Sequence, residues 1–481
     1  MILSGCALYK APKVDPIGIP QAFKENLHID NHNVQTEWWK NFHDENLNRL
    51  VNRAIQNNLR YQVALSNIKV ARTYVSQSII NRLIDLNVGF NGQHQTYQNN
   101  SIEGIPQEIP PPSESPNINF HNLFASAAYE LDIWNKKGNT YNRSKVNVQI
   151  QEADSRAVQL ALISEVVNSY FQIATLNGLL DNLNIQHTIT NKSIDILNVQ
   201  HRNGFINSSF VNSAKSNNEQ IITNINNLKK QRKVYMNQLA YLLGEYSEEF
   251  NYPIKAIPPQ ADFPALLPPT IPAQVLGNRP DVQKAFLDVL SYGYLKKEVL
   301  ANFLPSIPLY ASLNKEGASL DLITQSSALI IYGLSVTERI TNIGRNLSEY
   351  RRTKEYYKQA TLNYRDVVLG AFREVNNALL AYNEDYKNLN LQKNIQSNTA
   401  AQLKTARDQF KAGAIDYNTY LQVEMTMQQS NYSLEVQKMY VYQDVIQIYK
   451  VLGLGVKENP KPQDQKTGCC VQPSFKKLKQ A

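Results

Sequence analysis

Two histidines four residues apart are the first candidates for metal chemistry. His28 and His32 would lie on the same face of a helix, a spacing that can bring two imidazoles to one metal ion. The segment around them has no helical pattern and offers no further ligand nearby, so a chance pairing is the favoured interpretation. His187 and His201 lie in a long helical stretch without an accompanying carboxylate pattern. The histidines therefore predict no metal site.

Catalytic motifs are missing from the rest of the sequence. It contains no glycine-rich phosphate loop, nucleophile elbow, zinc-binding helix motif or cysteine pair at ligand spacing. The 27 tyrosines are better explained by helix packing and membrane-interface positions than by a cofactor stack. We therefore predict a protein that is not an enzyme, with no catalytic or cofactor-binding residues.

Cys6 is the one candidate for covalent modification. Leu3-Ser4-Gly5-Cys6 resembles the bacterial lipobox, in which a signal peptidase cuts before the cysteine and the thiol receives a diacylglyceryl group. We predict a covalent lipid at Cys6, and Ala7 after it is compatible with export to the outer membrane. A charged leader and most of an apolar segment are missing before Cys6, so we expect the start as given to be truncated or misassigned.

The remaining cysteines and the net charge of +8 suggest no further site. Cys469 and Cys470 stand together in the tail and are predicted to be inert, because a disulfide framework would distribute its cysteines through the fold. Basic residues are spread thinly, apart from Lys476, Lys477 and Lys479 near the C-terminus. Solvated faces and a basic tail explain this pattern better than a nucleic-acid partner.

The sequence repeats itself at a constant spacing of 209 residues. The matching landmarks are Glu165-Val166 with Glu374-Val375, Gly204 with Gly413, and Leu243-Gly244 with Leu452-Gly453. A duplication explains this spacing, with the proline-rich segment as a linker between two copies. The predicted division is a lipobox and irregular leader at 1–34, a first repeat at 35–250, a linker at 251–278, a second repeat at 279–455 and a polar basic tail at 456–481.

Each repeat is predicted to hold one very long helix, two shorter helices and two strands. Helical stretches are expected at 45–82, 140–202, 207–243, 280–302, 345–411 and 416–452. The longest two would each span about 95–100 Å at ~1.5 Å per residue. Apolar and small residues alternate in steps of four and three, as in a coiled coil: Val146, Ile150, Ala153, Ala157, Leu160, Ser164, Val167, Phe171 and Ala174. The two short helices of each repeat would stack end to end beside its long helix.

Four strands are expected at 83–97, 119–134, 303–314 and 326–338, with a proline-rich loop at 99–117. Along the last strand, Ile330, Tyr332 and Leu334 form an apolar face, while Gly333 and Ser335 belong to the other. No run of about 18 apolar residues predicts a membrane-spanning helix, but strands of about 9–11 residues can also cross a bilayer. Four strands cannot close a barrel alone, so several chains would have to share one.

Three segments resemble the TolC-like outer-membrane efflux factors, in the lipoprotein (NodT-like) branch that serves RND-type tripartite pumps. The first is Trp38-Trp39-Lys40-Asn41-Phe42 with the helix leading to Asn58, and the second is Arg279-Pro280-Asp281-Val282 with Pro272 to Leu276 before it. The third is Phe410-Lys411-Ala412-Gly413 with Tyr420-Leu421. Together they cover about residues 35 to 455 in the family's order.

This resemblance implies a mainly α fold with a small membrane β-barrel. Three protomers would share a 12-stranded barrel above an α-helical tunnel through the periplasm. The resemblance implies that the chain forms a homotrimer in outer-membrane lipid. It also implies two protein partners, a periplasmic adaptor and an inner-membrane pump. The implied function is a passive conduit for small molecules across the periplasm and the bacterial outer membrane, relevant to antibiotic resistance.

The resemblance also assigns the candidate site. Gly204 and Gly413 would form the turns at the periplasmic tip, against the adaptor. Relatives often narrow the tunnel with acidic residues just past the second glycine, where this chain offers only Asp416, with Glu424 further on. Asp416 is therefore the candidate gate residue, and a role as a helix N-cap is an equal alternative.

Two alternative functions remain open from the sequence. The same architecture could be the exit duct of type I protein secretion. A periplasmic coiled-coil scaffold is the second alternative, but it would not need four alternating strands. The sequence does not identify the transported substrate, the pump or the adaptor.

Overall fold

The computed structural model describes residues 8–20, 23, 37–96, 117–256, 263, 266–267, 273–338, 340–455 and 475–477. Several predicted features lie outside these ranges: Cys6, His28, His32, Cys469, Cys470 and most of the two proline-rich segments.

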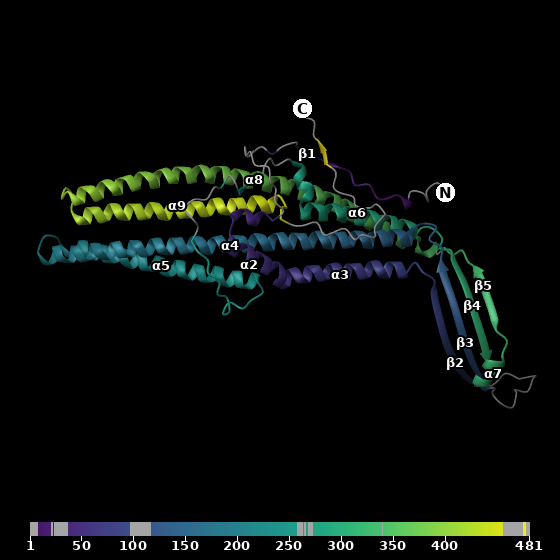
Figure 1. Ribbon diagram of the computed structural model, residues 1–481. Coiled ribbons are helices and arrows are strands. Elements are labelled where there is room, and N and C mark those ends of the chain that lie inside the picture. The colour runs from purple at the N-terminus through teal and green to yellow at the C-terminus, as the bar shows by residue number, and fades with distance from the viewer. Residues whose placement is uncertain are drawn as a thin grey trace, which may run out of the picture. The chain divides into compact units, whose positions relative to one another are not determined.

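Long helices make up most of the described chain (Figure 1). The α-helices are α2 (Glu45–Asn57), α3 (Leu59–Ile80), α4 (Lys136–Arg202), α5 (Ser208–Leu242), α6 (Pro280–Ala301), α7 (Leu320–Gln325), α8 (Ile343–Lys411) and α9 (Tyr417–Val451). Short 3-10 turns are η2 (Trp38–Phe42), η4 (Ala273–Asn278) and η5 (Ile340–Asn342). The strands are β1 (Ile17–Ile19), β2 (Asp85–Thr96), β3 (Asn117–Glu130), β4 (Pro308–Gly317), β5 (Leu329–Leu334) and β6 (Phe475–Lys477).

The chain forms two compact units, each assembled from separate segments. Unit one takes residues 1–14, 69–148 and 287–361, and unit two takes 15–68, 149–286 and 362–481. Both units draw on both predicted repeats, so compactness and sequence duplication divide the chain differently. The repeat boundaries inferred from the sequence stay a prediction.

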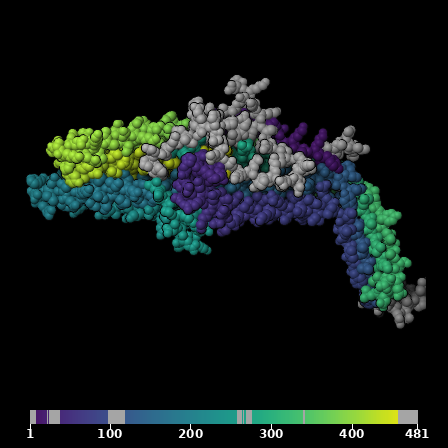
Figure 2. All heavy atoms as spheres, in the orientation of Figure 1, coloured from purple at the N-terminus to yellow at the C-terminus, as the bar shows by residue number. Residues whose placement is uncertain are grey.

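Unit one contains a four-stranded antiparallel sheet in the order β2-β3-β4-β5. One row across it is wholly apolar, since Val88 pairs with Ala125, Ala125 with Leu313, and Leu313 with Ile330. The neighbouring row, Asn87, Ser126, Ser312 and Ile331, is polar at three of its four positions and belongs to the opposite face, because side chains alternate along a strand. The predicted two-faced strands are therefore present, and β2 to β5 form a continuous slab in Figure 2.

Unit two contains two helical hairpins. The first hairpin is α5 with the part of α4 in this unit, and the second hairpin is α9 with the corresponding part of α8; each pair lies side by side in Figure 1. Leucines of α4 pack against isoleucines of α5, and Tyr432 and Val436 of α9 contact the same cluster. Eight of the nine predicted coiled-coil positions are buried, Ala157 being the partly exposed one.

Asn58 corrects one prediction, the single helix at 45–82. The structure has two helices there, because Asn58 adopts an extended conformation with φ −63° and ψ 118°. Its side-chain oxygen accepts a hydrogen bond from the backbone N–H of Tyr61 at 3.0 Å, which caps the start of α3. The chain therefore ends one helix and begins another at a single residue.

The Trp38 motif forms an aromatic core in unit two. Trp38 is fully buried and stacks on Tyr449, with ring centroids 4.8 Å apart. Asn41 donates a hydrogen bond to the hydroxyl of Tyr449 at 3.2 Å. The segment before α2 is thereby tied to the last turns of α9.

Two small features were not predicted from the sequence. The helix α7 follows β4 and is capped by Ser319, whose side chain accepts from the N–H of Leu322. The strands β1 and β6 pair in parallel, which places three residues of the predicted tail beside Ile17–Ile19 of the predicted leader. Among the described residues, no helix is both long and apolar enough to span a membrane.

Candidate functional site

The first hairpin turns at Gly204. Its φ of 78° is left-handed, a conformation that favours glycine. The N–H of Gly204 bonds to the carbonyl of His201 at 3.0 Å, and the N–H of Phe205 bonds to that of Gln200 at 2.9 Å. This pair of bonds is a Schellman motif, which satisfies the last carbonyls of α4 and reverses the chain.

The second hairpin turns in the same way at Gly413. Its φ is 73°, its N–H bonds to Phe410 at 3.0 Å, and the N–H of Ala414 bonds to Gln409 at 2.8 Å. All donors and acceptors lie 209 positions after those of the first turn. A Cβ at either glycine would meet no atom within 4 Å, so only the backbone conformation requires glycine there.

Asp416 caps the start of α9. Its carboxylate accepts from the backbone N–H of Thr419 at 2.8 Å and from the Thr419 hydroxyl at 3.1 Å. The Thr419 N–H bond holds the pKa of Asp416 below its ordinary value, so the side chain is charged at neutral pH. The N-cap alternative is therefore seen directly, and a role in gating stays a prediction.

The surfaces around the two turns differ in chemistry. At the first turn, Phe205 and Phe210 are exposed. At the second turn, Tyr420 stacks on both Phe410 and Tyr417, and all three ring centroids lie 5.2–5.9 Å apart. The turns thus share a backbone but present different side chains.

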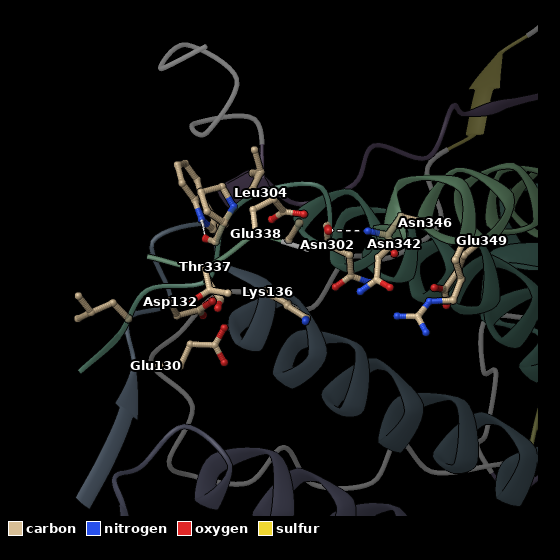
Figure 3. A pocket seen from close by; sticks show the side chains of 16 residues that line it. Glu130, Asp132, Lys136, Asn302, Leu304, Thr337, Glu338, Asn342, Asn346 and Glu349 are labelled. Carbon is tan, nitrogen blue, oxygen red and sulfur yellow. Dashed lines mark hydrogen bonds between the residues drawn. The ribbon is translucent and has the colours of Figure 1, made fainter. Parts of the chain in front are cut away.

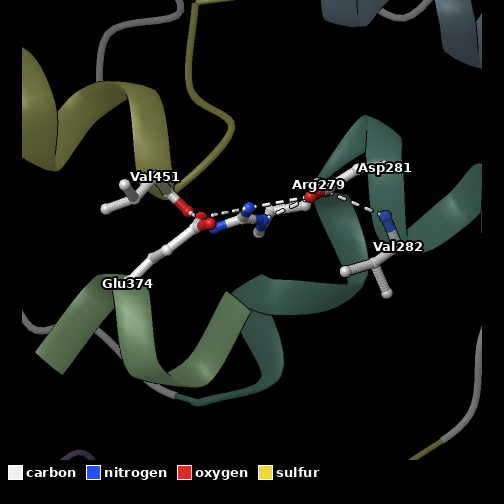
Figure 4. Close-up of polar contacts among 5 residues, drawn as sticks. All are labelled: Arg279, Asp281, Val282, Glu374 and Val451. Atoms are coloured by element: carbon white, nitrogen blue, oxygen red, sulfur yellow. Dashed lines mark hydrogen bonds and ion pairs between the residues drawn. The ribbon is translucent and has the colours of Figure 1, made fainter. Parts of the chain in front are cut away.

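At the other end of the second hairpin, Arg279 forms a cluster that the sequence had suggested only as a family motif (Figure 4). Its guanidinium donates to the carbonyl of Val451 at 2.8 Å and to the Glu374 carboxylate at 2.7 Å. Two further bonds, of 3.0 and 2.8 Å, run to the carboxylate of Asp281. Arg279 is 7% exposed, so a charged side chain is buried here with its partners.

A second unpredicted feature is the pair of carboxylates Asp385 on α8 and Asp444 on α9. Burial and the nearby Asp385 raise the pKa of Asp444 to about 7. Gln437 donates to both the carbonyl and the carboxylate of Asp385. The sequence signal was an acidic residue between two apolar pairs of α9, Val441-Tyr442 and Val445-Ile446.

Unit one has a polar cavity of about 610 Å³ where the strands meet the helices. Figure 3 shows Glu130 and Glu338 on its strand side and Asn346 and Glu349 on its helix side. Asp132 caps α4, accepting from the N–H groups of Lys137 and Gly138 at 3.0 and 2.8 Å. Glu130 and Asp132 therefore lie at the strand-to-helix connection.

The first described residues of the chain dock onto this same connection in unit one. Leu8 is buried, and its carbonyl accepts from the side chains of Asn135 and Asn139 at 3.2 and 3.3 Å. The hydroxyl of Tyr9 donates to the carbonyls of Asp132 and Ile133. Cys6, two residues before Leu8, is outside the described residues. No group of three potential metal-binding side chains occurs within the described ranges.

The comparisons with known proteins identify the class. A sequence profile of the outer membrane efflux protein family matches residues 50–245 and 271–454, so the chain belongs to this family. SilC of Salmonella typhimurium, a probable outer membrane lipoprotein, is 24% identical over 453 residues, covering 89% of this chain and 90% of SilC. The cation efflux system protein CusC of Escherichia coli O6:H1 is 23% identical over 473 residues, with 92% and 95% covered.

The solved structure of the CmeC outer membrane channel of Campylobacter jejuni has the same fold. Its TM-score is 0.81 at 21% identity, covering 94% of this chain and 96% of CmeC. The chain therefore has the TolC-like fold and is the outer-membrane channel component of an efflux system. It is a passive conduit rather than an enzyme, and it acts in the bacterial outer membrane and periplasm.

Proposed function

We propose that three copies of this chain form one conduit, with their four-stranded sheets joined edge to edge into a closed wall of twelve strands. The observation that carries the proposal is the two-faced sheet with β2 and β5 at its edges. Backbone groups at such edges cannot remain unpaired in lipid. The apolar row from Val88 to Ile330 would face the lipid, and the mostly polar row from Asn87 to Ile331 would face water.

The two hairpin turns are the proposed periplasmic tip. Gly204 and Gly413 end helices of 67 and 69 residues, which are long enough to extend about 100 Å. The exposed aromatic residues beside both turns support contact with a periplasmic adaptor, which in turn would connect the channel to an inner-membrane pump. Asp416, charged and at the second turn, is the proposed gate residue.

A covalent lipid at Cys6 is the proposed anchor. Cys6 lies at most about 7 Å from Leu8 along an extended chain, and Leu8 docks beside the strand-to-helix connection of unit one. A lipid attached to Cys6 would therefore lie close enough to the four-stranded sheet to insert into the membrane that the sheet crosses. The naming of SilC as a lipoprotein supports the proposal.

The substrate would be selected by the pump rather than by this chain. CusC is named as a cation efflux protein, whereas SrpC of Pseudomonas putida is named for solvent efflux, although both are about equally similar to this chain. The same type of conduit therefore serves chemically different cargo, and we propose small molecules as the general class.

Assembly is the direct test. The protein, expressed with an authentic lipoprotein signal sequence, should be extracted from outer membranes as a particle of three times 54.7 kDa by light scattering corrected for detergent. A fatty-acid probe should label it, and Cys6→Ser should remove the label. A stable monodisperse monomer would reject the shared wall of strands.

A further inference from the structure

Arg279 connects both helices of the second hairpin to the start of α6. One guanidinium nitrogen bonds to the Val451 carbonyl at the end of α9, and another bonds to the Glu374 carboxylate on α8. Asp281, in the first turn of α6, holds the same guanidinium through two bonds. Three helices therefore meet at one buried charge.

We call the contact between Arg279 and the second hairpin a joint. The first hairpin has a corresponding joint at Asn58, which carries no charge. Asn58 precedes α3, as Arg279 precedes α6, and both of these helices have 22 residues. The Asn58 side chain donates to the carbonyl of Leu242 at 3.0 Å, and Leu242 lies 209 positions before Val451. Glu165 lies 209 positions before Glu374 in the sequence, but the amide of Asn58 is neutral and provides no charge corresponding to that of Arg279.

Close packing is common to the two joints. A Cβ added at Gly453 would lie 3.1 Å from the Cα of Arg279, and one at Gly244 would lie 2.7 Å from the Asn57 carbonyl oxygen. Both glycines are left-handed, with φ of 69° and 71°. Both joints therefore combine a left-handed glycine with a close backbone approach, and the second joint also holds the buried charge of Arg279.

We propose that Arg279 is a positioning residue for the gate, which sets the resting angle of the second hairpin through its ion pair with Glu374. The inference rests on the proposed function, in which the Gly413 turn lies at the mouth of the conduit. Glu374 precedes the end of α8 at Lys411 by a length of helix of about 55 Å. Over such an arm, a rotation of about 2° at the joint would move the turn by roughly 2 Å.

The ion pair between Arg279 and Glu374 is the part of the joint that can respond to ionic strength. The Glu374 side chain is 45% exposed and lines a cavity of about 250 Å³ together with Arg279 and Lys450. Water and salt can therefore reach the pair and screen it. Burial alone would lower the pKa of Arg279, but Asp281 and Glu374 raise it overall, so the guanidinium stays charged.

The decisive comparison is Glu374→Gln against Glu165→Gln in the full-length, lipidated protein. Glutamine keeps the shape and can still accept a hydrogen bond, so only the charge is removed. We expect Glu374→Gln to give a several-fold higher conductance of trimers in planar bilayers, with unchanged trimer yield and melting temperature. Glu165→Gln removes the same charge 209 positions earlier, at a residue that lines a separate cavity with Asp444 and Lys450, and should conduct like the wild type.

Ionic strength provides a readout that a purely structural role would not change. The ratio of Glu374→Gln to wild-type conductance should fall toward one as salt is raised from about 0.1 to 1 M, because salt screens the wild-type pair as well. Arg279→Lys keeps the charge but not the forked geometry, and its conductance should lie between the two. Equal conductance of Glu374→Gln and Glu165→Gln at low salt would overturn the inference.

The outcome at Asp416 separates this inference from the proposed function. If Asp416→Asn alters conductance while Glu374→Gln does not, the tip is the mouth and only the role of Arg279 is wrong. If neither substitution alters conductance in assembled trimers, the role of Arg279 is wrong and Asp416 acts only as a cap, and wild-type conductance of Gly413→Pro trimers would then reject the placement of the mouth as well.

Discussion

Asn207 and Asp416 cap the two shorter hairpin helices from positions 209 residues apart. Asn207 accepts from the N–H of Ser209 at 2.6 Å, and Asp416 accepts from that of Thr419 at 2.8 Å. An amide oxygen thus performs at one turn the task that a carboxylate performs at the other. The charge of Asp416 is not needed for capping and can be tested separately.

Asp416→Asn should leave stability unchanged and alter the response of the conduit to cations. The amide preserves the cap, as at Asn207, whereas Asp416→Ala removes it and should cost about 1 kcal/mol of helix stability. Block of single-channel current by divalent cations, measured alongside melting temperature, checks both expectations. Identical block in wild type and Asp416→Asn would leave capping as the only role of this residue.

Gly413→Pro should abolish efflux while trimers persist in the membrane. Proline fixes φ near −65° and lacks an N–H, so it can neither adopt the observed 73° nor donate to Phe410. Gly413→Asn is the matched control, because asparagine tolerates the left-handed region and nothing obstructs its Cβ. Efflux is measured by drug susceptibility in a strain lacking the endogenous channel. Wild-type efflux by Gly413→Pro trimers would show that the turn is not the functional tip.

Ile330→Lys should reduce the amount of protein inserted in the outer membrane. Ile330 lies in the apolar row of the sheet, and a lysine at the bilayer midplane costs about 2–4 kcal/mol. Ser312→Lys places the same charge on the opposite face, where the proposed conduit holds water, and should insert normally. Quantitative blotting of membrane fractions checks the pair. Equal loss in both variants would contradict the proposed orientation of the sheet.

Asp444 should make the protein less stable as the pH rises from about 4 to 7. The unfolded chain releases this proton near the ordinary pKa of 3.8, whereas the folded chain retains it until about 7. Between these values the folded state binds more protons, so the free energy of unfolding falls with increasing pH and levels off above 7.

The Asp444→Asn variant is the control for this pH dependence. It should lose this component, changing the melting temperature by a few degrees relative to wild type across the same range. Asp385→Asn should flatten the curve only in part, because it removes the neighbouring charge and leaves the burial of Asp444. Parallel melting curves for wild type and Asp444→Asn would show that the pair does not titrate in this way.

The sequence predicted best those features that depend on neighbouring residues. Left-handed glycines, the cap at Asp416 and the alternation through Ile330 depend on local backbone chemistry, and all three are present in the structure. The single helix expected at 45–82 was wrong because helix-compatible residues flank Asn58 on both sides, although the family motif includes a helix that leads to Asn58. The cluster at Arg279 was suggested only as a motif, since its partner Glu374 is 95 residues away and nothing local identifies it.

The constant spacing of 209 residues has an evolutionary consequence. It holds at Gly204 and Gly413 and again at Gly244 and Gly453, so under the predicted duplication the two hairpins have kept equal lengths between these positions. Substitutions have meanwhile replaced most of the shared residues. The predicted duplication therefore implies selection on hairpin length, as expected of two hairpins whose turns must lie at the same level in the proposed conduit. An engineered insertion of one heptad into a single hairpin should be harmful, and a matching insertion in the other should partly restore function.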